Sequence, residues 1–167
     1  MTNGRLDVLY ANDLAEALFS DIFRDPFRPA NLARYVFINP RATTFRDWEK
    51  AASDTVAVLR AEAGRNPYDR GLSDLVGQLS TRSEEFRVRW AAHDVGFHRA
   101  ATKQMHHPLV GDLTLAFEIL ELPADPGLSV LTYSAEPGSQ SEEARRDLAR
   151  WSETRTKLSA ARAGSEA

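Results

Sequence analysis

The feature that most constrains the fold is a strict alternation of side chains between residues 113 and 119. In the sequence LTLAFEIL, a large apolar residue occupies every second position and creates one fully apolar face. This period of two is that of a β-strand. PADPG at 123–127 is a strong turn signal, and LSVLTYS at 128–134 is again rich in β-forming residues. HHPLVG at 106–111 is typical of a turn after TKQM, with Gly111 giving the backbone its freedom. Three consecutive antiparallel strands are therefore expected.

The N-terminal part of the chain combines one strand pattern with short helical patterns. RLDVLYAN at 5–12 alternates apolar and polar side chains, which predicts a half-buried strand. Asp13 can cap a following helix, and Asn31 can cap LARYVFI at 32–38. Pro40 ends this second helix, because the residue before a proline is disfavoured in the α region.

Longer amphipathic helices are expected where apolar side chains recur at steps of three and four. The first and longest covers residues 45–63, with Gly64 at the C′ position where a helix often ends. RNPYDRG is then a loop by composition. The next helix has its apolar face at Leu72, Leu75, Val76 and Leu79.

Two further helices are predicted from their caps. Ser83 can cap a helix that carries Phe86 and Trp90 at i, i+4 spacing. Ser139 and Glu142 resemble a capping box for a last helix. One side of that helix is formed by Ala144, Leu148, Trp151 and Leu158. Helices with a β-meander between them predict the α+β class, with helices packed on an antiparallel sheet.

Composition and charge exclude several classes of protein. A chain of 167 residues with 43% apolar residues can bury one core, so a single domain is expected. A net charge of −3 argues against nucleic-acid binding by the domain as a whole. The absence of cysteine excludes disulfides and thiolate metal sites. Because neither a signal peptide nor a membrane-spanning run is found, we expect a soluble cytoplasmic domain with no membrane contact.

The histidines do not have the spacing of a metal site or of a catalytic site. His93 and His98 are five residues apart and do not share a helix face, and His106 and His107 are neighbours that point apart in a strand. No GxSxG elbow and no phosphate-binding glycine loop is present. We therefore expect neither an enzyme nor a metal or other cofactor. His106 and His107 are expected at a polar turn, and His93 at a helix end.

Several phrases of the sequence resemble one known family, the C-terminal ligand-binding domain of MmyB-like transcription regulators. These are bacterial regulators of the helix-turn-helix class. The resemblance extends from about Asp7 to Leu148. The motifs that carry it are Phe37, Pro40 and Arg41; Asp47 and Trp48; LRAEAG at 59–64; Phe86, Trp90, His93 and Val95; HPLVG at 107–111; and AEPGS at 135–139.

The resemblance implies a PAS-like fold, in which an antiparallel sheet carries helices on one side. It also implies a sensor whose pocket accepts a small apolar, fatty-acid-like molecule and adjusts DNA binding by a separate N-terminal helix-turn-helix domain. That domain is expected to be absent from this chain. Residues 1–162 are expected to form the sensor domain and residues 163–167 a flexible tail, with DNA bound only through the missing domain.

The expected ligand site combines a polar end with an apolar lining. Candidates for the polar end are Arg34, Arg41 and His93; both arginines could equally be surface residues. Candidates for the lining are Phe37, Phe45, Trp48, Trp90, Leu115, Phe117 and Tyr133. Each of these could instead belong to the packed core. A homodimer is expected, and the alternative function is a dimerisation scaffold whose interior is filled by its own side chains.

Overall fold

The computed structural model describes residues 1–44, 46–92 and 100–163. Its described part has a four-stranded antiparallel sheet, seven α-helices and one 3-10 helix. The elements follow one another as β1 (Thr2–Asn3), α1 (Asp13–Leu18), α2 (Ser20–Phe23), α3 (Leu32–Ile38), η1 (Pro40–Thr44), α4 (Trp48–Arg65), α5 (Arg70–Arg82), α6 (Glu84–Ala92), β2 (Ala100–His107), β3 (Gly111–Glu121), β4 (Leu128–Ser134) and α7 (Gln140–Ala163). The predicted α+β class is confirmed.

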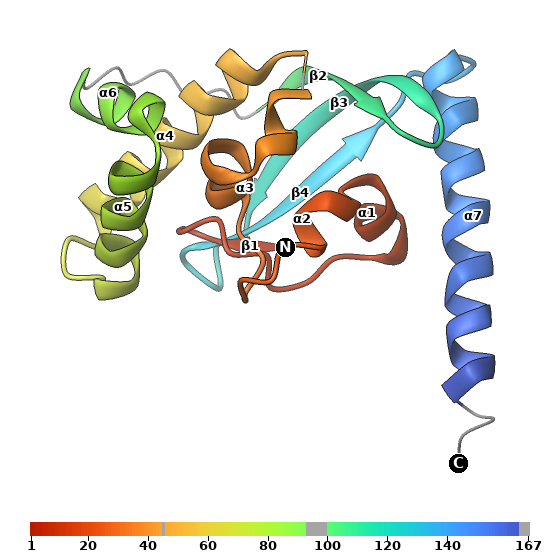
Figure 1. Ribbon diagram of the computed structural model, residues 1–167, viewed down its shortest axis with the longest axis horizontal. Helices are drawn as coiled ribbons and strands as arrows, with labels where there is room; N and C mark the ends of the chain where they lie inside the picture. Colours follow the sequence, from red (N-terminus) through yellow and green to blue (C-terminus); the bar gives the residue numbers. More distant parts are fainter. Residues whose placement is uncertain (45, 93–99, 164–167) are drawn as a thin grey trace.

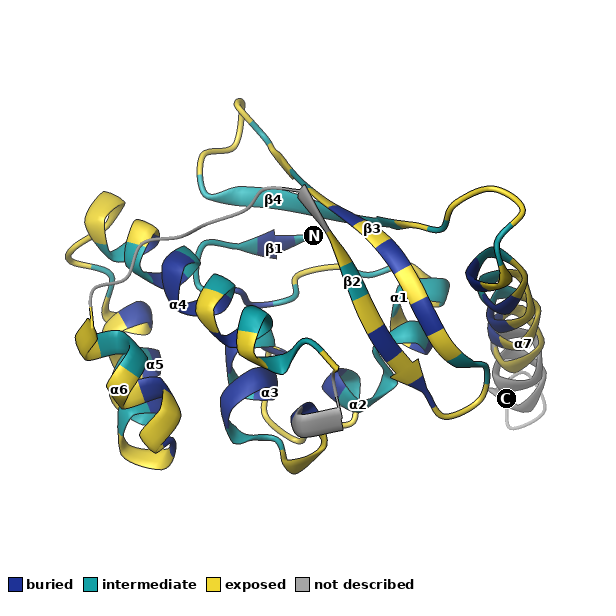
Figure 2. Cartoon of the chain, turned by 90° about the horizontal axis from the view of Figure 1, so that it is seen from above, coloured by how far each residue is buried: buried dark blue, intermediate teal, exposed yellow. Residues whose placement is uncertain are grey.

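The sheet has the strand order β1-β4-β3-β2, and its last three strands form the predicted meander. His107 pairs with Gly111 across the β2–β3 turn, where Gly111 has a φ of 76°. This left-handed conformation is readily reached by glycine, which has no Cβ. The alternation in β3 buries Leu113, Leu115 and Phe117 and exposes the residues between them (Figure 2). One face of the sheet is therefore an inner face that packs against helices.

Helices occupy both ends of the molecule (Figure 1). α4, α5 and α6 pack together at one end, α7 stands at the other, and α1, α2 and α3 lie between them on one side of the sheet. The end formed by α3–α6 has its own core, in which Leu59, Leu79 and Phe86 are fully buried. At the opposite end α7 packs on α1 and on β3, with Leu148 fully buried. The middle of the sheet thus lies between two separately packed ends.

Local capping signals place several helix starts correctly. Asn31 Oδ1 accepts a hydrogen bond from the Arg34 N–H at 2.9 Å, and α3 ends before Pro40 as expected. Ser83 Oγ accepts from the Phe86 N–H at 3.1 Å. Ser139 Oγ accepts from the Glu142 N–H at 3.2 Å, which confirms the predicted start of α7. These caps satisfy backbone donors that no helical carbonyl can reach.

Other boundaries differ from the sequence-based expectation. The predicted strand at 5–12 is wrong: Leu6 has a φ of 65°, and the Asn3 side chain accepts from the N–H groups of Arg5 and Asp7. These local bonds turn the chain, so only Thr2–Asn3 pairs with β4. The cap of α1 is Asn12, whose side chain accepts from Ala15 N–H, rather than Asp13.

The long helices also differ from prediction in their bounds and in the side chains that they bury. α4 begins at Trp48 and runs through Gly64 to Arg65, so Gly64 is not the C′ residue, and Asn66 ends the helix instead. α7, with 24 residues, is longer than α4, with 18. Trp151 is exposed, because the buried face of α7 continues from Leu148 to Ser152. Steps of three and four from Leu148 lead to Trp151 and Ser152, and the smaller side chain is the buried one.

Candidate ligand-binding site

A cavity lies between the inner face of the sheet and the helices α1 to α4. Its interior holds about 920 Å³ not occupied by protein atoms, including the part that is open to solvent. We call it the main cavity. Its apolar described lining consists of Leu6, Phe19, Ile22, Leu32, Tyr35, Val36, Ala51, Val58, Phe117, Ile119, Leu131 and Tyr133.

The sheet side of the main cavity follows from strand register. Phe117 pairs with Tyr133, and Ile119 pairs with Leu131, so the four side chains form one patch across β3 and β4. The Phe117 and Tyr133 ring centroids lie 5.2 Å apart. Burial raises the pKa of the Tyr133 hydroxyl above its ordinary value, so this wall carries no charge at neutral pH.

The helix side depends on a break between two short helices. Phe19, with a φ of −112°, lies between the two helices as the C-cap of α1 and the N-cap of α2. Its ring reaches the sheet and lies 5.0 Å from the Tyr133 ring, measured between centroids. The break therefore turns an aromatic side chain inward, where it contacts the opposite wall.

The rim of the main cavity is polar and lies between α4 and the edge strand β2. Asp47, Lys50 and Asp54 recur at helical spacing on one face of α4, and opposite them are Thr102, Lys103 and Gln104. The Gln104 backbone N–H donates to Asp47 Oδ2 at 3.2 Å and ties the edge strand to the start of α4. The cavity thus has an apolar interior and a rim with charges of both signs.

Lys103 lies where these two regions meet. It occupies the inner face of β2, opposite Leu115, and its ammonium is 4.4 Å from the centroid of the Phe117 ring. Burial lowers the pKa of Lys103 below its ordinary value of 10.5; Asp54 and Asp47 oppose this shift, and Lys50 adds to it. A partly desolvated ammonium next to an apolar cavity favours an anionic or strongly polar group nearby.

A second cavity adjoins the main cavity near the N-terminus, and we call it the N-terminal cavity. It holds about 740 Å³ between atoms, again including space open to solvent. Its lining includes Met1, Tyr10 and Ala15, together with five residues that it shares with the main cavity. The shared residues are Phe19, Ile22, Leu32, Leu131 and Tyr133.

The structure brings two of the expected lining residues to the main cavity and places others in the packed interior. Phe117 and Tyr133 line the main cavity. Leu115 is buried in a cluster with Met105, Leu113 and Ala144. Phe37 is buried in the core at the α3–α6 end, where its ring packs edge-on to Phe86.

The expected tryptophans belong to that same helical end. The Trp48 indole N–H donates to the Val36 carbonyl at 2.9 Å, and its ring packs edge-on to Phe37. Trp90 stacks on Phe86 with centroids 5.5 Å apart, beneath the guanidinium of Arg60. Both indoles are packed against protein, not aimed into the main cavity.

The expected polar end is spread over different parts of the surface. Arg34 donates from Nε to Gln78 Oε1 at 2.8 Å and lines a separate polar cavity with Arg5, Asp7 and Asp74. Arg41 pairs with Asp21 at 2.6 Å and lines another cavity beside His107. The remaining two candidates, Phe45 and His93, lie outside the described residues.

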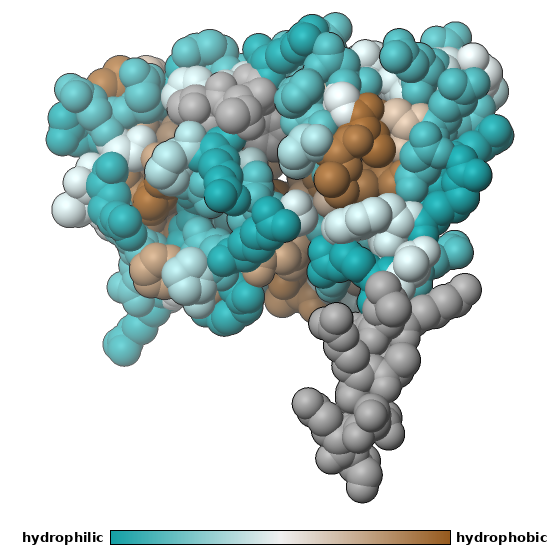
Figure 3. All heavy atoms as spheres, turned by 45° about the vertical axis from the view of Figure 1, so that its right-hand side comes forward, coloured by the Kyte–Doolittle hydropathy of each residue, from teal (hydrophilic) through white to brown (hydrophobic). Residues whose placement is uncertain are grey.

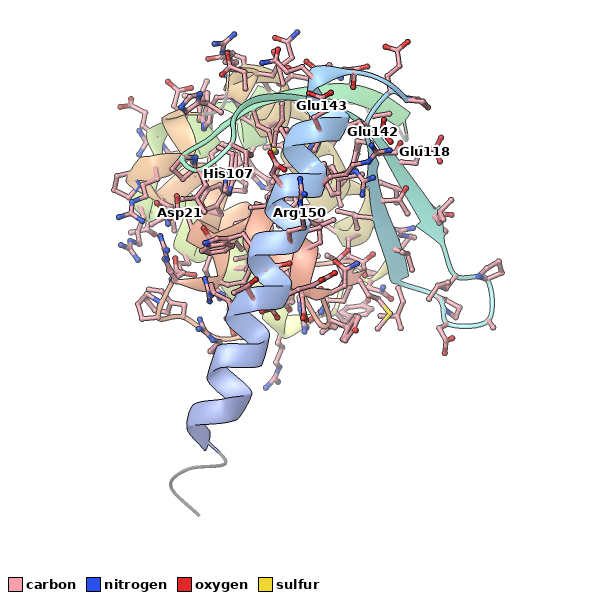
Figure 4. The ribbon with its side chains drawn as sticks, turned by 90° about the vertical axis from the view of Figure 1, so that its right-hand side faces the viewer. Asp21, His107, Glu118, Glu142, Glu143 and Arg150 are labelled. Carbon is pink, nitrogen blue, oxygen red and sulfur yellow. The ribbon has the colours of Figure 1, made fainter. Side chains whose placement is uncertain are left out.

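The two neighbouring histidines have different environments. His106 is exposed and pairs with Asp112 at 2.7 Å. His107 is buried; its Nε2 lies 3.1 Å from the Ala17 carbonyl oxygen, and its Nδ1 accepts from the Leu109 N–H. Figure 4 shows His107 and Asp21 on the same side of α7. Burial lowers the pKa of His107, although Asp21 opposes that shift.

Metal ligands and membrane spans were sought among the described residues. Within 1–44, 46–92 and 100–163, no three His, Asp or Glu side chains lie together as a group that could hold a metal ion. Over the same ranges, no helix has the length and apolar character needed to cross a membrane. On the face shown in Figure 3, hydrophilic residues predominate and hydrophobic residues reach the surface in a few separate patches.

Sequence reasoning missed the lysine at the cavity rim and the aromatic residue from the helix side. In TKQMHH, Lys103 shares its parity with Met105 and His107, and all three side chains point inward. Because alternate residues of a strand share a face, this spacing could have placed Lys103 on the inner face once the buried face of the strand was known. Phe19 had no comparable signal, because the break between α1 and α2 has no proline or glycine.

Comparison with known proteins gives one family. Residues 1–149 match the model of the MmyB-like transcription regulator ligand binding domain. No curated protein matches the chain. The family is one of regulator domains that bind ligands, and it is not a family of enzymes. Since the match covers most of the 167 residues and includes every element that builds the main cavity, the chain belongs to the MmyB-like transcription regulator ligand-binding domain family.

Proposed function

We propose that this domain senses a fatty-acid-like molecule, whose chain enters the main cavity and whose carboxylate meets Lys103. The observation that carries the proposal is a partly desolvated lysine at the rim of an otherwise apolar cavity. Lys103 Nζ makes no hydrogen bond to another described residue, and its described contact is the face of the Phe117 ring. A ligand carboxylate would supply the acceptor that this ammonium lacks.

The energetics favour an amphiphile over a purely polar ligand. Each methylene taken out of water contributes about 0.8 kcal/mol, so about ten methylenes contribute roughly 8 kcal/mol before association costs. A charge-assisted bond to Lys103 adds about 1.5–3 kcal/mol.

The regulatory part of the proposal concerns what ligand binding changes. We propose that the PAS-like domain acts in the cytoplasm, as a homodimer, on DNA binding by a separate helix-turn-helix domain. A ligand can do this only if it binds one conformation better than another. Supporting this, helices from both ends of the molecule meet the cavity region: α4 forms its rim, and α1, which packs on α7, ends at Phe19.

The first test is mass spectrometry of the purified domain, under native conditions and then after organic extraction. The proposal predicts a co-purifying acid with a long apolar chain, or stoichiometric uptake of palmitate when palmitate is added. A domain that neither retains nor takes up any acid would contradict it and favour the scaffold function.

The second test isolates the role of Lys103. Lys103→Gln removes the charge and should weaken palmitate binding about 10- to 100-fold, as measured by calorimetry. Methyl palmitate has the same chain without the carboxylate, so its affinity should stay nearly unchanged. Equal losses for the acid and the ester would show that the substitution damaged the cavity rather than a charge contact.

A further inference from the structure

The main cavity and the N-terminal cavity meet at a partition built from both layers of the molecule. Phe19 and Ile22 reach it from the helix layer, and Leu131 and Tyr133 reach it from β4. The Phe19 and Tyr133 rings are in contact across the partition, with centroids 5.0 Å apart and planes tilted by 59°. This aromatic pair therefore joins the two layers at the point where one cavity ends and the other begins.

The spaces on the two sides of the partition differ in their openings. The main cavity ends at the charged rim formed by Asp47, Lys50, Asp54 and Lys103. The N-terminal cavity is lined by Met1, Tyr10 and Ala15 and has no charged side chain among its described lining residues. A chain anchored at Lys103 therefore extends away from the rim and meets the partition before it can reach the second space.

We infer that Phe19 and Tyr133 set the length of the acyl chain that the domain accepts, and that the N-terminal cavity is a latent extension of the ligand site. This inference rests on the proposed function, because it concerns the far end of the same cavity. Chains that end at the aromatic pair bind with every methylene out of water. Longer chains must displace a ring or leave methylenes in solvent.

The experiment measures dissociation constants for saturated acids from octanoate to stearate on the wild-type chain and on two variants. In the wild type, affinity should rise about fourfold for each added methylene and then level off at one chain length. Phe19→Leu opens the partition while keeping an apolar side chain, so the levelling-off point should move to longer acids. A gain of about fourfold should follow for each methylene that enters the second cavity.

A matched second substitution tests where the extra chain goes. Ala15 lies one helical turn before Phe19 and lines the N-terminal cavity but not the main cavity. Ala15→Phe in the Phe19→Leu background fills the second cavity and should return the levelling-off point to that of the wild type. Octanoate is the control for any general loss of affinity, because Phe19 and Tyr133 also line the main cavity, and each variant's levelling-off point is read from its own series.

The outcomes separate the two hypotheses. If acids bind but Phe19→Leu and wild type level off at the same length, the inference is overturned and the proposed function stands. If the wild type binds no acid, both are overturned. Circular dichroism checks that the variants fold; should Phe19→Leu fail to fold, Tyr133→Leu opens the same contact from the sheet side and replaces it.

Discussion

At the scale of single residues, β2 carries two bases on its inner face whose contacts differ. Burial lowers the pKa of both Lys103 and His107. His107 has protein partners at both ring nitrogens, the Ala17 carbonyl and the Leu109 N–H. Lys103 faces the main cavity and contacts an aromatic ring. The histidine therefore fastens the β2–β3 turn to α1, whereas the lysine is available to a ligand.

The lowered pKa of His107 predicts that the folded protein loses stability in mild acid. Its neutral form accepts at Nδ1, and its pKa in the folded state lies below the ordinary value of 6.5. The unfolded chain therefore binds a proton more readily, and the stabilisation that is complete above pH 6.5 is lost as the pH falls through the folded-state value. The melting temperature of the wild type should fall more steeply below pH 6.5 than that of His107→Gln. Parallel pH profiles for the two proteins would contradict this assignment.

Sequence reasoning at this scale found side chains whose direction is fixed by strand periodicity. Phe117 and Tyr133 were expected at the ligand site and line the main cavity, because a period of two sends them to one face. Phe37, Trp48 and Trp90 have the same apolar character, yet they pack among α3, α4 and α6. Periodicity says which side of an element is buried but not whether a cavity or another side chain lies opposite. That depends on packing between elements distant in sequence.

At the scale of elements, the buried Asn31 side chain adds to the backbone hydrogen bonds from Val8 N–H to the Ala30 carbonyl and from Leu32 N–H to the Leu6 carbonyl, which together position α3. Asn31 caps the helix, and its Nδ2 donates to the Arg5 carbonyl and to Asp7 Oδ1, both at 2.9 Å. Asp7 in turn accepts from Asn3 and from Arg5 Nε. One amide therefore joins the start of α3 to the N-terminal segment beside β1.

Asn31→Ala should lower the free energy of unfolding by about 3 kcal/mol, because it removes the cap and the Nδ2 donor that bonds the Arg5 carbonyl and Asp7 Oδ1. Asn12→Ala is the matched control: it removes the cap of α1 at an exposed position and should cost about 1 kcal/mol. Urea titrations of both variants measure the two values. Similar losses would show that the two extra hydrogen bonds of Asn31 contribute little.

Elements with strong local signals were predicted best. The caps Asn31, Ser83 and Ser139 act within three residues of themselves, so the sequence alone contains what fixes them. Gly64 misled because glycine is tolerated inside a helix whose buried face is long enough. The strand expected at 5–12 failed because the Asn3 side chain competes with strand pairing for backbone N–H groups.

At the scale of the whole molecule, the two ends are packed independently and the cavities lie in the region between them. Figure 1 shows α7 standing apart from α4–α6, with its second half projecting past the rest of the molecule. Among the α7 side chains described up to Arg155, the buried ones run from Ser141 through Ala144 and Leu148 to Ser152. The first half of α7 therefore belongs to the core that it shares with α1 and β3.

A truncation tests this division of α7. Ending the chain after Arg155 should change the free energy of unfolding by less than about 0.5 kcal/mol, because the buried positions Ser141, Ala144, Leu148 and Ser152 are retained. Leu148→Ala, in the first half, should cost about 2–5 kcal/mol by leaving a cavity. Thermal denaturation with light scattering follows both stability and mass. A truncated chain that loses several kcal/mol, or halves its mass, would place the predicted dimer contact on the second half.

Because α7 is long, a small tilt of the helix near the cavity produces a larger displacement at its far end. The helix has 24 residues, which at about 1.5 Å per residue makes a rod of roughly 36 Å. The first half of α7 packs against α1. Phe19, which directly follows α1, lies in the wall of the main cavity. The part beyond Ser152 is roughly 16 Å long. A tilt of about 10° at the contact between α7 and α1 therefore moves its last turn by roughly 3 Å. If the proposed ligand tilts α7 in this way, a side-chain-sized adjustment in the cavity becomes a displacement large enough to make or break a contact at the end of the helix.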